Sequence, residues 1–157
     1  MTSNIEMNEM AKEESANALS RVLADTYILY IKTHNYHWNV EGPSFRGLHE
    51  MFEEQYRDMW TAIDDIAERI RALDHYAPGT HEKFKSLATV RENEAIPEAE
   101  EMLRELITDT ETVAQTIRSA ISIAQSNGDE ASAGLLTDRL ITHEKQLWMM
   151  KSTNKTR

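Results

Sequence analysis

Hydrophobic residues recur every three or four positions along most of the chain, which is the spacing that places side chains on one face of an α-helix. Four long segments have this pattern, and the stretches between them contain most of the five glycines and three prolines. The segments run from about residue 4 to 37, from 44 to 74, from 97 to 126 and from about 129 to 151. The pattern therefore predicts an all-α protein built from four long helices.

The apolar positions also predict which side chains form the core. The second segment has the most regular apolar stripe, and the residues beside the stripe are polar or charged. Its expected core residues are Leu48, Phe52, Tyr56, Met59, Ile63, Ile66, Ile70 and Leu73. Those of the first segment are Leu19, Val22, Leu23, Tyr27 and Tyr30, and those of the fourth are Leu135, Leu136, Leu140, Leu147 and Trp148.

The lengths of the connections predict how the helices are joined. Short links join the first helix to the second and the third to the fourth, so each of these pairs should be antiparallel. The link over residues 75–96 can reach about 70 Å when extended, which exceeds the roughly 45 Å length of a helix of about 30 residues. The second and third helices can therefore run parallel through one long crossover. Within it, Thr80 followed by Phe84 and Leu87 predicts a short extra helix.

Composition and charge narrow the class of protein. A chain of 157 residues with 40% hydrophobic content is long enough for one domain with its own core. The absence of cysteine excludes disulfides and thiolate chemistry, and neither a secretory leader nor a membrane span is recognisable, so we expect a cytoplasmic protein. The formal charge of −10 disfavours attraction to membranes or nucleic acid and favours cations. Residues 1–14 and 151–157 are expected to be mobile tails.

Two histidines and three carboxylates in and before the second helix have a spacing that suits a metal site. His49 and Glu53 are four residues apart, as are Asp64 and Glu68, so each pair shares a helix face, and His37 ends the first helix. The fifteen residues between His49 and Asp64 span about 22 Å along a helix axis, whereas a metal–ligand bond is about 2 Å long. One chain cannot close that gap, so the five residues can share an ion only if two chains contribute.

An antiparallel copy of the second helix would close the gap. It would place His49 opposite Glu68 of the partner subunit and Glu53 opposite Asp64 of the partner subunit, which predicts a two-fold dimer with two metal sites. Trp60 lies on the same strip of the helix, as is typical of an interface. Each of these residues taken alone is more often part of an ordinary solvated face, so a helical scaffold without metal chemistry stays an alternative.

Three motifs carry a family resemblance: KTHNYHWNV at residues 32–40, LHEMFE at 48–53 and DDIAER at 64–69. Together they resemble the Dps family (DNA-binding protein from starved cells), the mini-ferritins, and the likeness covers nearly the whole chain. The resemblance implies a ferritin-like four-helix bundle whose long crossover carries a short extra helix. It also implies a ferroxidase centre at a two-fold interface. The implied metal ligands are His37, His49 and Glu53 of one subunit with Asp64 and Glu68 of the other.

The resemblance implies the chemistry as well. The protein would bind Fe(II), oxidise it with hydrogen peroxide in preference to dioxygen, and store ferric mineral in a hollow homododecamer, thereby protecting DNA from oxidative damage. Imidazole and carboxylate ligands suit Fe(II) or manganese, and sulfur ligands are absent from the candidate set. The chain contains no Glu-x-x-His motif, so the usual di-iron site within a single four-helix bundle is poorly supported.

Nonspecific DNA binding is the alternative function. Members of the family that bind DNA commonly use lysine-rich tails, because neutralising phosphates releases counterions. Here the N-terminal segment is acidic, whereas residues 151–157 contain three cations, Lys151, Lys155 and Arg157. Repetition of this short tail over a shell could give avidity, so a nucleoid-associated role stays open.

A few further residues complete the prediction. The resemblance implies acidic pores near the start of the fourth helix, where Asp129, Glu130 and Asp138 are candidates. His34 precedes His37 by three residues and is expected to support the site or line the interface. Trp38 and Trp60 lie beside the candidate ligands in the sequence. They are expected either to exclude water from the site or accept oxidising equivalents, or only to pack against neighbouring residues. The remaining histidines, His75, His81 and His143, are expected to be solvated.

Overall fold

The computed structural model describes residues 7–155, which form five α-helices and contain no β-strand. The four long helices are α1 (Glu9–Asn39), α2 (Phe45–Ala72), α4 (Ala99–Ser126) and α5 (Glu130–Thr153), and α3 (His81–Leu87) is a single short helix. The predicted all-α class with four long helices is therefore confirmed. None of the helices in this described part of the chain is long and apolar enough to cross a membrane.

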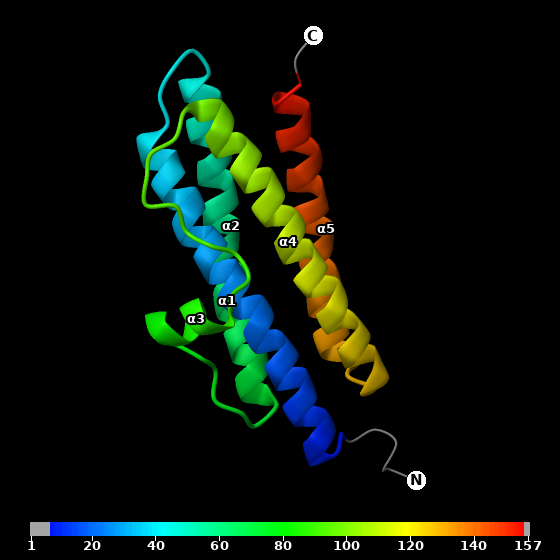
Figure 1. The fold of residues 1–157 in the computed structure, drawn as a ribbon. Helices are drawn as coiled ribbons and strands as arrows, with labels where there is room; N and C mark the ends of the chain where they lie inside the picture. Colours follow the sequence, from blue (N-terminus) through cyan, green and yellow to red (C-terminus); the bar gives the residue numbers. More distant parts are fainter. Residues whose placement is uncertain (1–6, 156–157) are drawn as a thin grey trace.

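The four long helices pack side by side as a bundle, in which α1 contacts both α2 and α4, and α5 contacts both α4 and α2 (Figure 1). The pairs α1–α2 and α4–α5 are antiparallel, whereas α2 and α4 run in the same direction. The crossover between α2 and α4 must therefore return along the bundle, and it does so with α3 packed against α1. The parallel pair, the long crossover and the short extra helix are all confirmed.

Local backbone chemistry sets where the helices begin and end. The Asn8 side chain accepts a hydrogen bond from the Ala11 amide at 2.8 Å and caps α1, and Thr80 caps α3 as predicted by accepting from the Lys83 amide at 3.2 Å. The short links need left-handed backbone, which glycine adopts without steric cost. Gly42 before α2 has φ 112°, and Gly128 before α5 has φ 69°.

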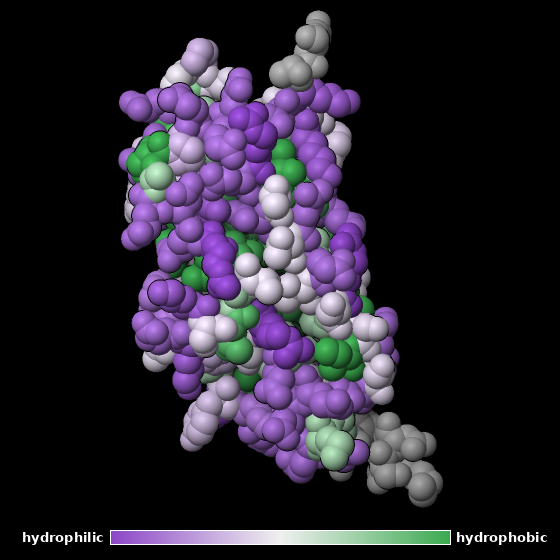
Figure 2. Space-filling view, in the orientation of Figure 1, coloured by the Kyte–Doolittle hydropathy of each residue, from purple (hydrophilic) through white to green (hydrophobic). Residues whose placement is uncertain are grey.

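The predicted core stripe of α2 faces the bundle interior. All of its residues are buried except Ile63, which is partly buried. The surface in Figure 2 is correspondingly mostly hydrophilic, with separate small hydrophobic areas. One core prediction is wrong: Trp148 is 64% exposed. It follows the partly buried Leu147 by one position, which rotates it by about 100° around α5 and out of the interior.

Part of each predicted tail is helical. Residues 9–14 belong to α1 and residues 151–153 to α5, so neither stretch is a tail. Lys151 also forms an ion pair with Glu111 on α4, at 3.0 Å between Nζ and Oε2. Residues 1–6 and 156–157 of the predicted tails lie outside the described residues.

Candidate metal centre

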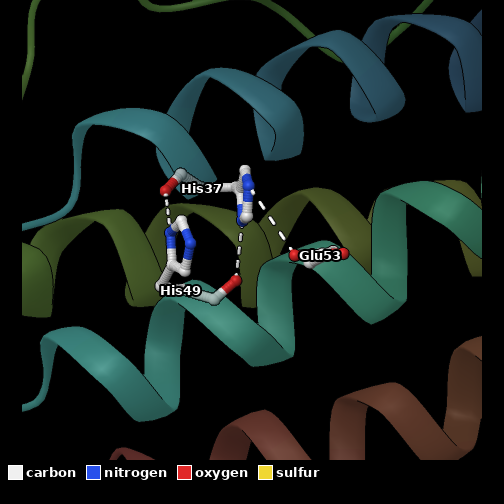
Figure 3. A group of neighbouring side chains, drawn as sticks. All are labelled: His37, His49 and Glu53. Carbon is white, nitrogen blue, oxygen red and sulfur yellow. Dashed lines mark hydrogen bonds and ion pairs between the residues drawn. The ribbon is translucent and has the colours of Figure 1, made fainter.

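His37, His49 and Glu53 come together where the end of α1 lies beside the start of α2 (Figure 3). The tight link between the two helices brings them close, because it turns the chain back on itself within a few residues. Each of the three side chains offers one ligand atom, and these atoms all lie within 4.8 Å of one another. The His37 side chain is only 8% exposed, whereas His49 and Glu53 are partly exposed, so the group reaches from between the helices to the surface.

Reciprocal hydrogen bonds fix both imidazole rings. His37 Nδ1 donates to the backbone carbonyl of His49, and His49 Nδ1 donates to the carbonyl of His37, each at 2.7 Å. Because a carbonyl can only accept, Nδ1 must carry the proton in both neutral rings, which leaves the lone pair on Nε2. The rings stack with centroids 3.9 Å apart and an interplanar angle of 15°. Both histidines are thus prepared to bind a metal ion through Nε2.

The two carboxylate oxygens of Glu53 have different neighbours. Oε1 lies 3.9 Å from His37 Nε2, and Oε2 accepts a hydrogen bond from Arg57 Nε at 2.8 Å. This hydrogen bond is the main reason why the pKa of Glu53 is lowered, so the side chain is anionic at neutral pH. Two atoms that bind one ion at about 2.1 Å each can be at most about 4.2 Å apart. The separation of Nε2 and Oε1 therefore fits a single shared cation.

A second carboxylate group lies further along α2. Asp64, Asp65 and Glu68 offer ligand atoms within 4.8 Å of one another, and all three are exposed. The sequence prediction included Asp64 and Glu68 but missed Asp65, because it selected only pairs four residues apart on one helix face. As expected, the single chain holds the two groups apart, since fifteen residues of helix between His49 and Asp64 correspond to about 22 Å.

Aromatic side chains surround the histidine group. His34 stacks on Tyr56 with centroids 3.9 Å apart and lies 3.8 Å from Trp38, and its burial is the main cause of a lowered pKa. Beside it is a hollow of about 450 Å³, lined by Tyr30, His34, Tyr56, Arg57, Trp60 and Thr61. Trp38 and Trp60 are 64% and 65% exposed, so neither shields the site from water within one chain.

Two predictions about α5 are wrong. Asp129 was expected to line a pore, but it is 2% exposed, caps α5 and pairs with Arg69 at 2.8 Å. His143 was expected to be solvated, but it is completely buried, and its Nε2 accepts a hydrogen bond from Arg139 at 3.1 Å. The charged neighbours that suggested a solvated surface instead pair internally, since Arg139 binds Asp58 on α2 at 2.9 Å. Glu130 and Asp138 are exposed.

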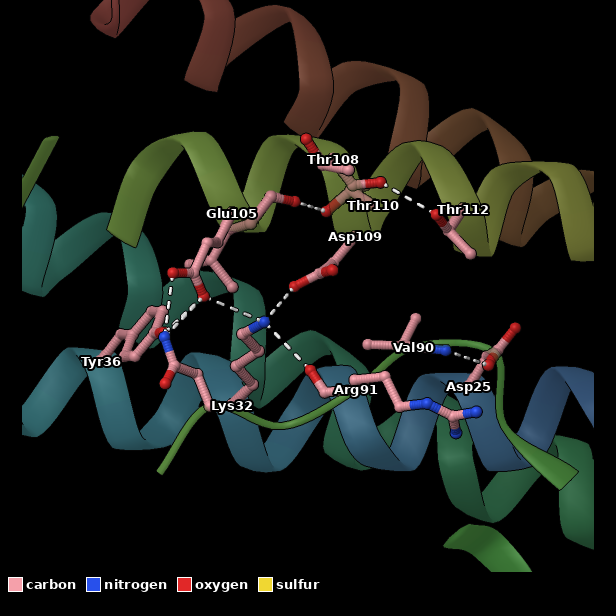
Figure 4. A network of polar contacts seen from close by, with 12 residues as sticks. Asp25, Lys32, Tyr36, Val90, Arg91, Glu105, Thr108, Asp109, Thr110 and Thr112 are labelled. Atoms are coloured by element: carbon pink, nitrogen blue, oxygen red, sulfur yellow. Dashed lines mark hydrogen bonds and ion pairs between the residues drawn. The ribbon is translucent and has the colours of Figure 1, made fainter. Parts of the chain in front are cut away.

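A separate polar network inside the bundle contains its own cation (Figure 4). The buried Lys32 ammonium lies 3.1 Å from Glu105 and 2.8 Å from Asp109, and it donates to the carbonyl of Arg91 in the crossover at 3.0 Å. Tyr36 donates to Glu105 at 2.7 Å. Because the lysine ammonium already occupies the position between these two carboxyl groups, the network ties the crossover to α1 and α4 and is not a candidate metal site.

Known proteins resemble this chain in both fold and sequence. Residues 16–156 match the family model of the ferritin-like domain. The chain is 37% identical to an uncharacterized low temperature-induced protein of Nostoc sp. over 95% of this chain and 84% of that protein. It is 35% identical to DNA protection during starvation protein 2 of Bacillus anthracis over 85% of this chain and 92% of that protein. The Dps crystal structure from Vibrio cholerae O1, described as a ferritin-like diiron-carboxylate protein, matches with a TM-score of 0.91 at 29% identity, covering 96% of this chain and 95% of that one.

The fold and the domain match place the molecule among the ferritin-like proteins, a class that includes diiron-carboxylate proteins. Within that class the chain belongs to the Dps family. Both the predicted ferritin-like bundle and the family resemblance are thereby confirmed.

Proposed function

We propose that this protein is a ferroxidase and an iron-storage protein. It binds Fe(II) at sites shared by two subunits, oxidises it with hydrogen peroxide in preference to dioxygen, and stores the ferric product in a homododecameric shell, which protects DNA from oxidative damage. The observation that carries the proposal is the pair of imidazoles locked with Nε2 free, with a Glu53 oxygen 3.9 Å from one of them. Iron is the substrate of the reaction, and the protein supplies its ligands.

Each residue has a distinct role in this proposal. His37 and His49 hold Fe(II) through Nε2, and Glu53 contributes one oxygen beside them. Asp64 and Glu68 of the partner subunit complete the site, and their charge favours the Fe(III) product over Fe(II). Two Fe(II) ions lose one electron each, while the O–O bond of hydrogen peroxide breaks and the two oxygens take up two electrons and two protons to give two waters.

The exposed aromatic residues support a shared site. Trp38 contacts His34 and Trp60 lines the hollow beside His34, and each leaves about two thirds of its surface in solvent in the single chain. Large exposed aromatic side chains beside a row of charges are typical of a protein interface. An antiparallel α2 of a second subunit would cover them and would bring its own acidic group to the histidines.

The test of this proposal mixes two inactive variants. His49→Ala and Asp64→Ala proteins are unfolded and reassembled together, and the rate of Fe(II) oxidation under peroxide is followed by ferric absorbance. If the sites are shared, one site in each mixed dimer combines the intact His49 of one chain with the intact Asp64 of the other, so about half of the sites in mixed dimers recover. Each variant reassembled alone is the control. Mixed shells that contain both chains by mass and are no faster than the controls would contradict a shared site.

Nonspecific DNA binding is a weaker second candidate. The names of several relatives refer to DNA protection. However, Lys151 lies inside α5 and pairs with Glu111, so fewer cations are available in the C-terminal segment than the sequence suggested. A salt-dependent gel shift with supercoiled DNA would detect this activity. A helical scaffold without metal chemistry would produce neither a shift nor an absorbance change with Fe(II).

A further inference from the structure

Arg57 binds the candidate iron ligand Glu53 through the carboxylate oxygen that is not the one nearest His37. It lies one helical turn after Glu53 on α2, and its Nε donates to Glu53 Oε2 at 2.8 Å. Oε1 of the same carboxylate faces His37 Nε2 (Figure 3). The guanidinium also lies over the Tyr56 ring, 5.5 Å from its centroid. Tyr56 itself is nearly buried and touches His37 edge-on with centroids 5.1 Å apart. The arginine is therefore held in place from two directions.

We propose that Arg57 is a positioning residue that limits how Glu53 binds the iron substrate. By donating to Oε2, it competes with the ion for that oxygen and so favours binding of the ion through Oε1 alone. By its positive charge, it weakens the binding of any cation in this position. Both effects keep the site loosely occupied, with a coordination position left for the oxidant. This inference rests on the proposed ferroxidase function.

The contacts of Arg57 indicate whether it raises or lowers the affinity of the site for a cation. A carboxylate that binds an ion through both oxygens needs both lone-pair regions free, and Glu53 Oε2 already accepts from Arg57. A unit positive charge next to a divalent ion is repulsive at any dielectric constant, and the repulsion is stronger where the site excludes water. The opposing effect is the loss of a preoriented side chain, which is small because exposed ion pairs contribute little. Removing the guanidinium should therefore tighten cation binding.

The chain offers a matched control on the same helix. Arg46 pairs with Glu50 four residues away at 3.2 Å, and both side chains are more exposed than those of Arg57 and Glu53. This pair has the same chemistry and spacing, but neither residue belongs to the candidate ligand group. A general effect of removing a surface arginine would appear in both variants, whereas an effect on the ligand would appear only for Arg57.

The experiment measures Zn(II) binding by calorimetry on the assembled protein, because Zn(II) has no redox chemistry and reports binding alone. Arg57→Gln should bind Zn(II) roughly tenfold more tightly than the wild type, given the loss of one nearby positive charge. Arg46→Gln should bind like the wild type. In steady-state oxidation of Fe(II) by peroxide, Arg57→Gln should lower both KM and kcat. Arg57→Lys keeps the charge and one donor, so its values should lie between those of the wild type and Arg57→Gln.

A double-mutant cycle tests whether Arg57 acts through Glu53. In a Glu53→Gln background, the further change Arg57→Gln should have little effect on Zn(II) affinity if the two residues act as a pair. Unchanged or weaker binding by Arg57→Gln, or an undiminished effect in the Glu53→Gln background, would overturn the inference. Shell size is checked for every variant, and if Arg57→Gln does not assemble, Arg57→Lys decides by the same criterion. A wild type that neither binds Zn(II) nor oxidises Fe(II) would instead refute the proposed function.

Discussion

The buried His143 should make the stability of the protein depend on pH in a measurable way. The side chain has no exposed surface, and this burial, followed by the neighbouring Arg139, lowers its pKa from the ordinary 6.5 to about 4. Its Nε2 accepts a hydrogen bond from Arg139, so protonation would also remove an acceptor and place two cations side by side. The folded protein therefore keeps His143 neutral over a pH range in which the unfolded chain is already protonated.

The sign and size of the effect follow from proton linkage. Between pH 6.5 and 4 the unfolded state binds more protons than the folded state at this residue, so the free energy of unfolding decreases as the pH falls. Each pH unit in this interval contributes about 1.4 kcal/mol, which gives about 3 kcal/mol for the whole interval. This contribution is fully present above pH 6.5 and is lost by about pH 4.

The variant His143→Gln tests this prediction, because glutamine keeps a side-chain acceptor for Arg139 but does not titrate. Urea unfolding followed by the helical circular dichroism signal is compared between pH 7 and pH 4 at one protein concentration, because assembly also contributes to stability. The wild type should lose about 3 kcal/mol more than the variant over this range. His81→Gln, which replaces an exposed histidine, is the control and should behave like the wild type. Parallel pH curves for the wild type and His143→Gln would show that His143 does not stay neutral in the folded protein between pH 6.5 and 4.

Two further predictions concern the acidic group on α2 and the crossover. The double variant Asp64→Ala with Glu68→Ala should lose rapid Fe(II) oxidation but keep its helical signal, because both side chains are exposed; unfolding by circular dichroism would show that they support the fold instead. Asp25→Ala should lower the free energy of unfolding by about 3 kcal/mol or more in urea titrations, because buried or partly buried donors lose their acceptor. The Asp25 carboxylate accepts from the Thr89 amide at 2.6 Å, the Val90 amide at 3.1 Å and the Thr116 hydroxyl at 2.7 Å. A loss below about 1 kcal/mol would mean that solvent replaces these bonds.

The fold was predictable from the sequence because its determinants are periodic and local. The stripe of α2 marks its buried face at every turn, and the length of the link after it decides the parallel topology. The errors occur where a long-range partner decides the environment. Asp129 and His143 are polar residues near other charges, which usually indicates solvent. However, Asp129 pairs with Arg69 on α2, and the Arg139 that contacts His143 pairs with Asp58 on α2, so both residues are buried. Such pairs between distant residues leave no periodic signal in the sequence.

The candidate site was predictable in part for a related reason. His49 and Glu53 share a helix face, and that spacing alone indicates a pair of ligands, while the family motif adds His37. The orientation of the rings was not predictable, because it depends on two carbonyl oxygens that face the opposite imidazoles only after the link has folded. The role proposed for Arg57 had a signal in the sequence, the favourable Glu–Arg spacing of four residues, but Arg46 and Glu50 form a similar pair that includes no candidate ligand.

In the proposed function, α2 provides ligands to both halves of the shared metal site, so activity depends on assembly. His49 and Glu53 of the histidine group lie on α2, as does the whole acidic group, at positions that no bending of one helix can join. In the proposed function, each chain therefore contributes half of two sites and completes none alone. A two-fold axis makes both sites at once, because the contact that brings one acidic group to one histidine pair repeats itself in reverse. In the proposed function, Fe(II) is then oxidised only by assembled protein, where the exposed Trp38 and Trp60 are covered and the product can be enclosed. On the same proposal, we expect monomeric chains to be inactive, so that no ferric ions form where they cannot be enclosed.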